Sequence, residues 1–233
     1  MKRIIERTLF WFMDGDEQKS AMDNRYFSLG TLLNRLMGER YEGKRIKFIN
    51  IYFNTEETYK IHPQVPKHNT HFYGGHLNYD DVFDLNSFNK MTEIEQDQFI
   101  WKRAFEILKE ASIAIKNKEL LKACEYAYKK GIEINLNPDY RMVENDIVLF
   151  DQALKASVWV NFKKEGMYSK FTLEKENEII FEQEIDKTKN GIEFFLEMYK
   201  DIELKDHDII IKGRKDVEYL PLTIPIKKEE LAH

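Results

Sequence analysis

Hydrophobic and polar residues change their spacing twice along the chain. In the first 60 residues the pattern predicts a strand over residues 3–12, a helix over 28–38 and a second strand over 44–54. The helix follows from leucines spaced by three and four, which lie on one helix face, and from Gly38 as a stop. The second strand is apolar on both faces in its middle, so we expect it in the centre of a sheet.

Helical spacing dominates the next stretch. Thr92 and Glu95 form a capping-box pattern, in which each side chain can bond the backbone N–H of the other residue. Asn117 can cap a second helix, and Gly131 fits its C-terminal stop. We expect the two helices to form an antiparallel pair. The apolar positions that predict their buried faces are Trp101, Ala104, Phe105 and Leu108 in the first, and Leu120, Leu121, Cys124, Ala127 and Tyr128 in the second.

After Asn137-Pro138-Asp139, hydrophobic and polar residues alternate as they do in strands. These three residues are the best candidate for a domain boundary. Four short alternating segments, separated by turn signals, predict an antiparallel meander. A helix over residues 190–200 and two final strands should follow, and Pro221 and Pro225 place the last strand at a sheet edge. The predicted meander strands lie within residues 146–150, 156–162, 167–175 and 177–185.

Together these patterns predict an α+β fold. An N-terminal strand-helix-strand unit precedes the central antiparallel helix pair, and a C-terminal antiparallel β-meander with one packed helix follows. We expect an α/β front half over residues 1–136, a β-rich back half over residues 137–233, and packing of both as one compact unit. With 233 residues, 42% of them hydrophobic, the chain is long enough to bury a substantial core.

The composition narrows the classes of function. Cys124 is the single cysteine, so an intramolecular disulfide and a Cys-rich metal site are excluded. The formal net charge is −5, which disfavours a nucleic-acid-binding surface. No apolar run approaches the roughly 18 residues of a membrane span, and the N-terminus lacks the apolar core of a signal peptide. We therefore expect a soluble, cytoplasmic protein that contacts no membrane.

The segment from Ile61 to Asp81 holds four of the six histidines. From Lys60 to Met91 the apolar residues follow neither the helical nor the strand spacing for long, so we expect a long loop. In a compact domain such a loop is usually functional or mobile. A metal site in this loop would use imidazole and carboxylate ligands, both common for zinc. Its prolines and glycines disfavour a helix, and the spacing H-E-x-x-H is absent. The ligands of such a site would be His68, His71, His76 and Asp80.

The same segment also suits recognition of a partner protein. Tyrosine and histidine offer contact area with a polar tip, whereas glycine and asparagine let the backbone bend. We expect this loop to bind no metal and, if it has a role, to contact a partner; the alternative is a surface loop with aromatic anchors and no special role. The candidate partner-binding residues are Phe72, Tyr73, His71, His76 and Tyr79.

Catalytic sequence motifs are absent. The chain has no phosphate-binding loop of the form G-x-x-x-x-G-K-[ST], no G-x-G-x-x-G, no G-x-S-x-G and no kinase signature. In size, acidity and lack of such motifs it is similar to the cysteine-poor α+β immunity proteins with which bacteria neutralise toxins. That resemblance implies a non-catalytic protein-binding module without a cofactor, whose partner is a basic toxin. The alternative is a metal-dependent hydrolase that uses the His68, His71 and His76 loop.

Overall fold

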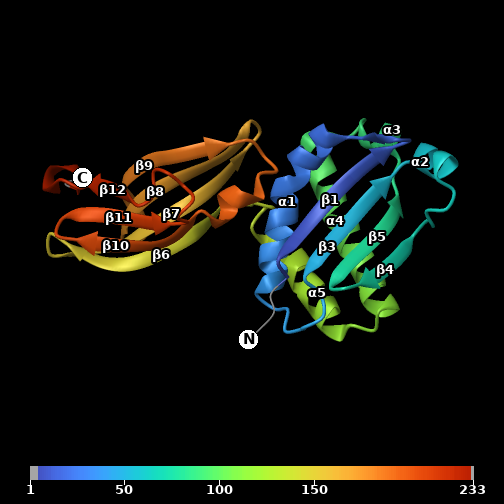
Figure 1. The fold of residues 1–233 in the computed structure, drawn as a ribbon, viewed down its shortest axis with the longest axis horizontal. Helices are drawn as coiled ribbons and strands as arrows, with labels where there is room; N and C mark the ends of the chain where they lie inside the picture. The colour runs from blue at the N-terminus through green and yellow to red at the C-terminus, as the bar shows by residue number, and fades with distance from the viewer. Residues whose placement is uncertain (1–4, 232–233) are drawn as a thin grey trace. The chain divides into compact units, whose positions relative to one another are not determined.

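A computed structural model describes residues 5–231, and its content is α+β, as predicted (Figure 1). The chain divides into two compact units, the first ending at Pro138 and the second beginning at Asp139. Packing of the two halves as one body stays a prediction. Among the described residues, no helix combines the length and the apolar character needed to cross a membrane.

The first unit is built on a five-stranded sheet in the order β2-β1-β3-β5-β4 (Figure 1). Strands β1, β3 and β5 are parallel, and β2 and β4 are antiparallel edge strands. The central place predicted for β3 is confirmed. Two residues of the strand predicted over 3–12 lie outside the described part of the chain. The strands are β1 Arg7–Asp14, β2 Glu17–Gln18, β3 Phe48–Asn54, β4 Asn69–Tyr73 and β5 His76–Val82.

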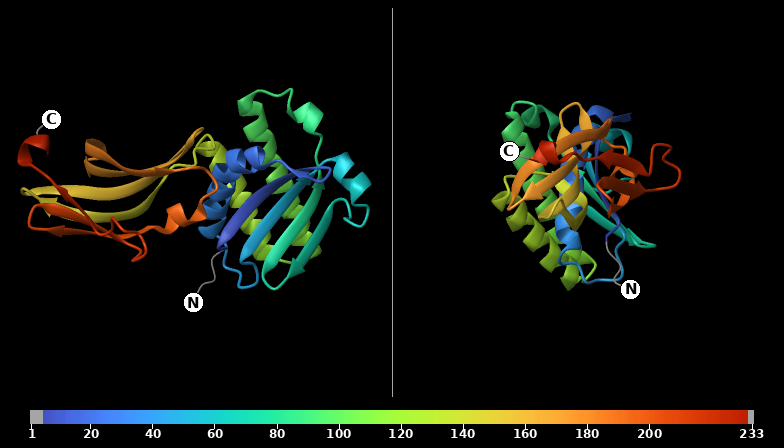
Figure 2. Two further views of the ribbon diagram at one scale, coloured as in Figure 1. Left: turned by 45° about the horizontal axis from the view of Figure 1, so that its top comes forward. Right: turned by 90° about the vertical axis from the view of Figure 1, so that its left-hand side faces the viewer.

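Three long helices pack on one face of this sheet, and Figures 1 and 2 show α4 and α5 behind the strands. Alternate residues of β3 point toward them, and Ile49, Ile51 and Phe53 are at most 1% exposed. The helix predicted over 28–38 begins earlier, at Ser20. The helices are α1 Ser20–Gly38, α4 Glu93–Ala114 and α5 Lys118–Glu133, with two short ones, α2 Glu56–Ile61 and α3 Leu85–Phe88.

The caps predicted for the helix pair are confirmed. The Glu95 N–H donates to Thr92 Oγ1 at 3.4 Å, and the Thr92 N–H donates to Glu95 Oε2 at 2.8 Å. The Asn117 side chain caps α5 by accepting from the Leu120 N–H at 3.0 Å.

Gly131, by contrast, does not end α5, which continues to Glu133. A Cβ at position 131 would lie 2.2 Å from Cζ2 of Trp101, a distance that real Cβ contacts do not show. The glycine therefore serves close packing of the two helices, and the prediction of a stop at this residue was wrong.

The long loop predicted between Lys60 and Met91 is largely a β-hairpin of β4 and β5. Its two-residue turn is Gly74-Gly75, and both residues have positive φ, 59° and 89°. Two successive positive φ angles are what a type I′ turn requires, and glycine adopts them at little cost. The glycines that seemed to break regular structure instead connect two paired strands.

The second unit contains the predicted meander, a four-stranded antiparallel sheet in the order β6-β7-β8-β9. A three-stranded sheet, β10-β11-β12, follows, and the proline-containing β12 is at its edge, as predicted. The strands are β6 Tyr140–Leu149, β7 Gln152–Lys163, β8 Gly166–Lys175, β9 Glu178–Thr188, β10 Tyr199–Lys205, β11 Asp208–Gly213 and β12 Leu222–Pro225.

The helix predicted over 190–200 is present only as a short 3-10 helix, η1, at Glu193–Glu197. The chain then enters β10 at Tyr199, whose hydroxyl lies 2.8 Å from both Ser169 Oγ and Tyr219 Oη. These hydrogen bonds to distant residues fix Tyr199 in a strand, against the helical spacing of its neighbours. A second 3-10 helix, η2, spans Lys228–Leu231.

Partly buried tyrosine hydroxyls lead us to expect that the free energy of unfolding falls at alkaline pH. Burial raises the pKa of Tyr59 to about 12, and burial also raises the pKa of Tyr26 and of Tyr79 above its ordinary value. Above about pH 10 the unfolded chain releases these protons while the folded chain keeps them, so stability should fall as pH rises toward about 12. Urea unfolding at a series of pH values measures the fall. The Tyr59→Phe variant should show a shallower fall, and equal slopes in the two proteins would contradict the assignment.

Candidate functional site

The face of the first unit's sheet that lies opposite its three long helices is called here the open face, and Figure 1 views the strands from that side. Strand alternation decides which side chains it carries. Thr8, Phe10 and Phe12 of β1 point toward the helices, so the residues between them belong to the open face. From β1, β3, β5 and β4 the open face holds Arg7, Leu9, Trp11, Phe48, Asn50, Tyr52, His76, Asn78, Asp80, Asn69, His71 and Tyr73.

At the end of the open face nearest the hairpin turn, one row of side chains crosses the four strands. The pairing sets Arg7 beside Phe48, Phe48 beside His76, and His76 beside Tyr73. The Arg7 guanidinium lies 5.4 Å from the centre of the Phe48 ring. The rings of Phe48 and His76 stack with centroids 4.6 Å apart. Such contacts favour one orientation of the rings.

Side-chain amides occupy the middle of the open face. The Trp11 indole Nε1–H donates to Asn50 Oδ1 at 3.2 Å, and Asn50 Nδ2 donates to Asn78 Oδ1 at 2.8 Å. Trp11 also stacks on Tyr52, with ring centroids 6.5 Å apart. The amides therefore have fixed directions, and the paired strands set His71 opposite Asn78.

Asp80 lies near the carboxyl end of the open face and is half-buried. It accepts a hydrogen bond from Asn54 Nδ2 at 3.2 Å. Burial raises the pKa of Asp80 above its ordinary value, and the bond from Asn54 opposes that rise. Burial likewise raises the pKa of Tyr52, and the negative charge of Asp80 adds to the effect. Asp80 thus places one carboxyl group at this end of the open face.

The five predicted partner-binding residues divide between the two faces of the sheet. His71, Tyr73 and His76 are exposed on the open face, and Tyr73, next to the turn, is 80% exposed. Phe72 and Tyr79 lie on the helix side. The Phe72 ring packs against the core below the Arg45 guanidinium, and the Tyr79 hydroxyl donates to Glu110. Three of the five are therefore available to a partner.

The four candidate metal ligands are not brought together. His68 Nδ1 lies 3.1 Å from Asp81 Oδ1, on the helix side of the strand. His76 is four residues from Asp80 along β5, a separation of about 13 Å in a strand. His71 pairs with Asn78 and is only a diagonal neighbour of Asp80. Within residues 5–231 no group of three or more His, Cys, Asp or Glu side chains is arranged to hold a metal ion.

The carboxyl ends of parallel strands are a common place for ligands. Here the acids at those ends have partners. Asp81 is 1% exposed and forms a two-point ion pair with Arg103 of α4, at 2.7 Å to Nε and 2.5 Å to Nη2. Asp14 accepts from the Thr55 hydroxyl at 2.8 Å. The Asp81 contact joins β5 to α4, and the Asp14 contact joins the end of β1 to the residue after β3. We therefore assign a structural role to both acids.

The sequence-based prediction overlooked the contribution of Trp11, Phe48 and Tyr52 to the open face. Part of their signal was present, because aromatic and amide residues alternate with isoleucines over residues 48–52 of β3, whereas residues 9–12 of β1 are apolar on both faces. Comparison of the chain with known protein families, with curated proteins and with solved structures finds no match.

Proposed function

We propose that this protein is a non-catalytic module that binds another protein through the open face and the β4–β5 hairpin. The observation that carries the proposal is the gathering of exposed and half-exposed aromatic rings, histidines and amides on one side of one sheet. Tryptophan, tyrosine and arginine dominate the energetics of protein interfaces because they bring large contact area at low entropic cost.

Preorganisation supports this use of the open face. Trp11 and Tyr52 stack, Phe48 and His76 stack, and Asn50 bonds both Trp11 and Asn78. A partner would not have to immobilise these side chains, so less of the binding free energy would be lost to ordering them. Tyr73 differs from them, because it projects beside the turn and remains the most accessible anchor.

Charge suggests the class of partner. The chain carries 41 acidic and 36 basic residues, a formal net charge of −5, while on the open face itself the Asp80 carboxylate and the Arg7 guanidinium carry opposite charges. Opposite charge accelerates the encounter of two proteins and disfavours wrong partners. Together with the general likeness to immunity proteins, this makes a basic protein toxin, neutralised in the bacterial cytoplasm, the partner that we propose.

The Tyr73→Ala variant tests the proposal. Its affinity for the partner should fall by at least tenfold, as for an interface hot spot worth about 2 kcal/mol. The free energy of unfolding should hardly change, because the side chain is 80% exposed. A photo-crosslinking residue at position 73, introduced in cells of the source organism, identifies the partner. Calorimetry with the purified partner then measures the affinity.

Ile113 provides the matched control. It is a large exposed side chain on α4, in a helix that packs on the other face of the sheet. Ile113→Ala should leave the affinity unchanged, and a crosslinker at position 113 should capture nothing in common with position 73. If Tyr73→Ala binds as tightly as the wild type, the hairpin is no part of the interface.

A further inference from the structure

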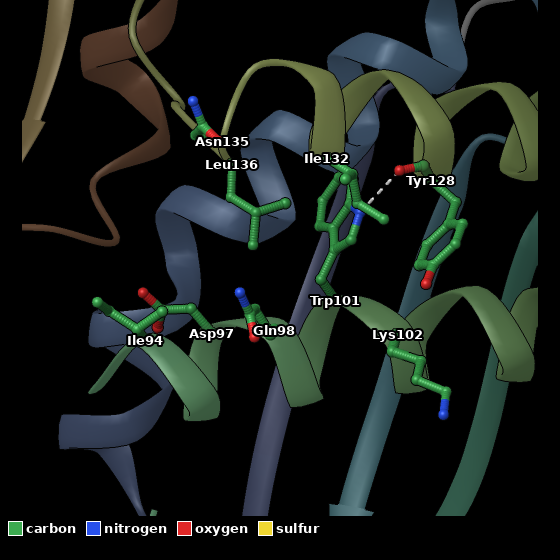
Figure 3. A pocket seen from close by; sticks show the side chains of 9 residues that line it. All are labelled: Ile94, Asp97, Gln98, Trp101, Lys102, Tyr128, Ile132, Asn135 and Leu136. Carbon is green, nitrogen blue, oxygen red and sulfur yellow. Dashed lines mark hydrogen bonds between the residues drawn. The ribbon is translucent and has the colours of Figure 1, made fainter. Parts of the chain in front are cut away.

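A pocket of about 610 Å³ lies between α4 and the C-terminal end of α5 (Figure 3). It is formed on the helix side of the first unit and shares no residue with the open face. Its wall includes two isoleucines that are unusually accessible, Ile94 at 71% and Ile132 at 52%. The lining residues are Ile94, Asp97, Gln98, Trp101, Lys102, Tyr128, Ile132, Asn135 and Leu136.

The floor of the pocket is rigid. Trp101 is 2% exposed, and its Nε1–H donates to the backbone carbonyl of Tyr128 at 3.2 Å (Figure 3). The same ring fills the space that a Cβ at position 131 would occupy, so Gly131 lets α5 approach it. The hydrogen bond and the close packing therefore hold the Trp101 ring in one position at the floor of the pocket.

The upper wall is set by the way α5 ends. The Leu136 N–H donates to the Gly131 carbonyl at 2.8 Å, and the Asn135 N–H donates to the Ile132 carbonyl at 3.0 Å. This pair of bonds is the Schellman motif, with Asn135 in the left-handed conformation that asparagine tolerates. Leu136 also has positive φ, 54°, which is uncommon for leucine. The turn directs its side chain toward α4, across the pocket (Figure 3).

Two charged side chains line the pocket, Asp97 and Lys102, and they differ in their burial and in their direction. Asp97 is half-buried and forms an ion pair with Arg25, whose Nη2 lies 3.6 Å from Asp97 Oδ1, beyond hydrogen-bond distance. Burial raises the pKa of Asp97, and the positive charge of Arg25 opposes that rise. Lys102 also has an ion-pair partner, Glu106 at 3.8 Å, and its ammonium points away from α5 (Figure 3). Of these two charged side chains that line the pocket, Asp97 is therefore the one that a ligand would meet.

We propose that this pocket binds a small amphiphilic amine, with its apolar body among Ile94, Ile132 and Leu136 and its protonated nitrogen beside Asp97. The volume lies within the roughly 300–1,000 Å³ that is usual for small-molecule sites. Contact with the two isoleucines removes apolar surface from water, and the ammonium supplies the donor that Arg25 does not bring within hydrogen-bond distance of Asp97. This binding is independent of partner recognition by the open face.

Three probes with one chain length and different head groups test the proposal: decylamine, decanol and decanoate. Each is added below the concentration at which it forms micelles. The chain has three tryptophans, so three indole N–H signals in the NMR spectrum report on separate places, and Trp→Phe variants assign them. Decylamine should shift the Trp101 signal and bind at least about tenfold more tightly than decanoate, the effect of one charge-assisted hydrogen bond.

Variants locate the site. Ile132→Trp should fill the pocket and abolish the Trp101 shift, whereas Ile113→Trp, on the same helix pair but outside the pocket, should preserve it. Asp97→Asn should bind decylamine and decanoate within about twofold of each other. If Ile132→Trp does not fold, Gln98→Trp fills the same space.

Three results would overturn the proposal. The first is a Trp101 signal that decylamine does not move. The second is a shift that survives in the filled variant, which would place the probe elsewhere. The third is equal binding of all three probes to the wild-type protein, which would remove the role of Asp97.

Discussion

Replacement of Trp101 by alanine is expected to lower the free energy of unfolding by about 3–5 kcal/mol, as large-to-small aromatic changes in a core do. The indole is 2% exposed, bonds the Tyr128 carbonyl, and packs on the backbone of Gly131. Its loss removes a contact between α4 and α5 and leaves a cavity between the two helices. Urea unfolding, followed by circular dichroism, measures the change.

Ile94→Ala is the control for this experiment. Ile94 is also a large apolar residue of α4, but it is 71% exposed, so its removal should shift the unfolding midpoint very little. A loss of under about 1 kcal/mol in Trp101→Ala would mean that the ring contributes no more than a surface side chain. The packing assigned to the helix pair would then be incorrect.

The second large effect is expected at the ion pair between α4 and β5. Arg103→Ala should cost about 3–5 kcal/mol, because it leaves the Asp81 carboxylate buried without its two-point partner. Asp81 is 1% exposed, and the remaining neighbour, His68, approaches only one of its oxygens, at 3.1 Å. Thermal and urea unfolding of the purified variant both report the loss.

A double variant separates two quantities: the destabilisation caused by a buried carboxylate without a partner, and the stabilisation that the ion pair itself contributes. In Asp81→Leu with Arg103→Met no buried charge remains, so stability should return part of the way toward that of the wild type. Lys60→Ala breaks an exposed ion pair with Glu57 and should hardly change the midpoint. If Arg103→Ala lowers the free energy of unfolding as little as Lys60→Ala does, the buried ion pair is not a stabilising contact.

Features that depend on neighbours in sequence could be predicted. The Thr92–Glu95 capping box, the Asn117 cap and the central strand that became β3 all follow from local patterns, and the structure confirms them. The meander was also predicted, because alternating residues and frequent turn residues determine it together, although β6 begins at Tyr140 and not at residue 146. The α+β class follows from these elements.

Features that depend on residues far apart in the sequence could not be predicted. The pairing of Asp81 with Arg103 joins residues 22 apart in the chain, and neither residue signals it alone. Tyr199 lies in a spacing typical of a helix but hydrogen-bonds to Ser169 and Tyr219, so β10 forms instead. The Gly74-Gly75 turn is a different case, because its hairpin signal was present but was interpreted as a break in structure.

The candidate site was half predictable for a similar reason. The sequence singled out the residues around the hairpin, yet it did not show which of them would share a face. Tyr73 and Phe72 are adjacent and similar in chemistry, but the pairing with β5 sends the first to the open face and the second toward the core. Only the pairing of β4 with β5 separates a possible anchor from a core residue.

The hairpin also restricts which insertions and deletions in β4 keep each side chain on its own face of the sheet. Loss of one residue within β4 would move the residues that precede it to the opposite face of the sheet, because side chains alternate while the Gly74-Gly75 turn keeps Tyr73 paired with His76. Loss or gain of two residues would keep each side chain on its own face and change only the reach of the strand. Changes of β4 length in steps of two would therefore enlarge or reduce the exposed surface of the hairpin while the residues that face the core stay the same.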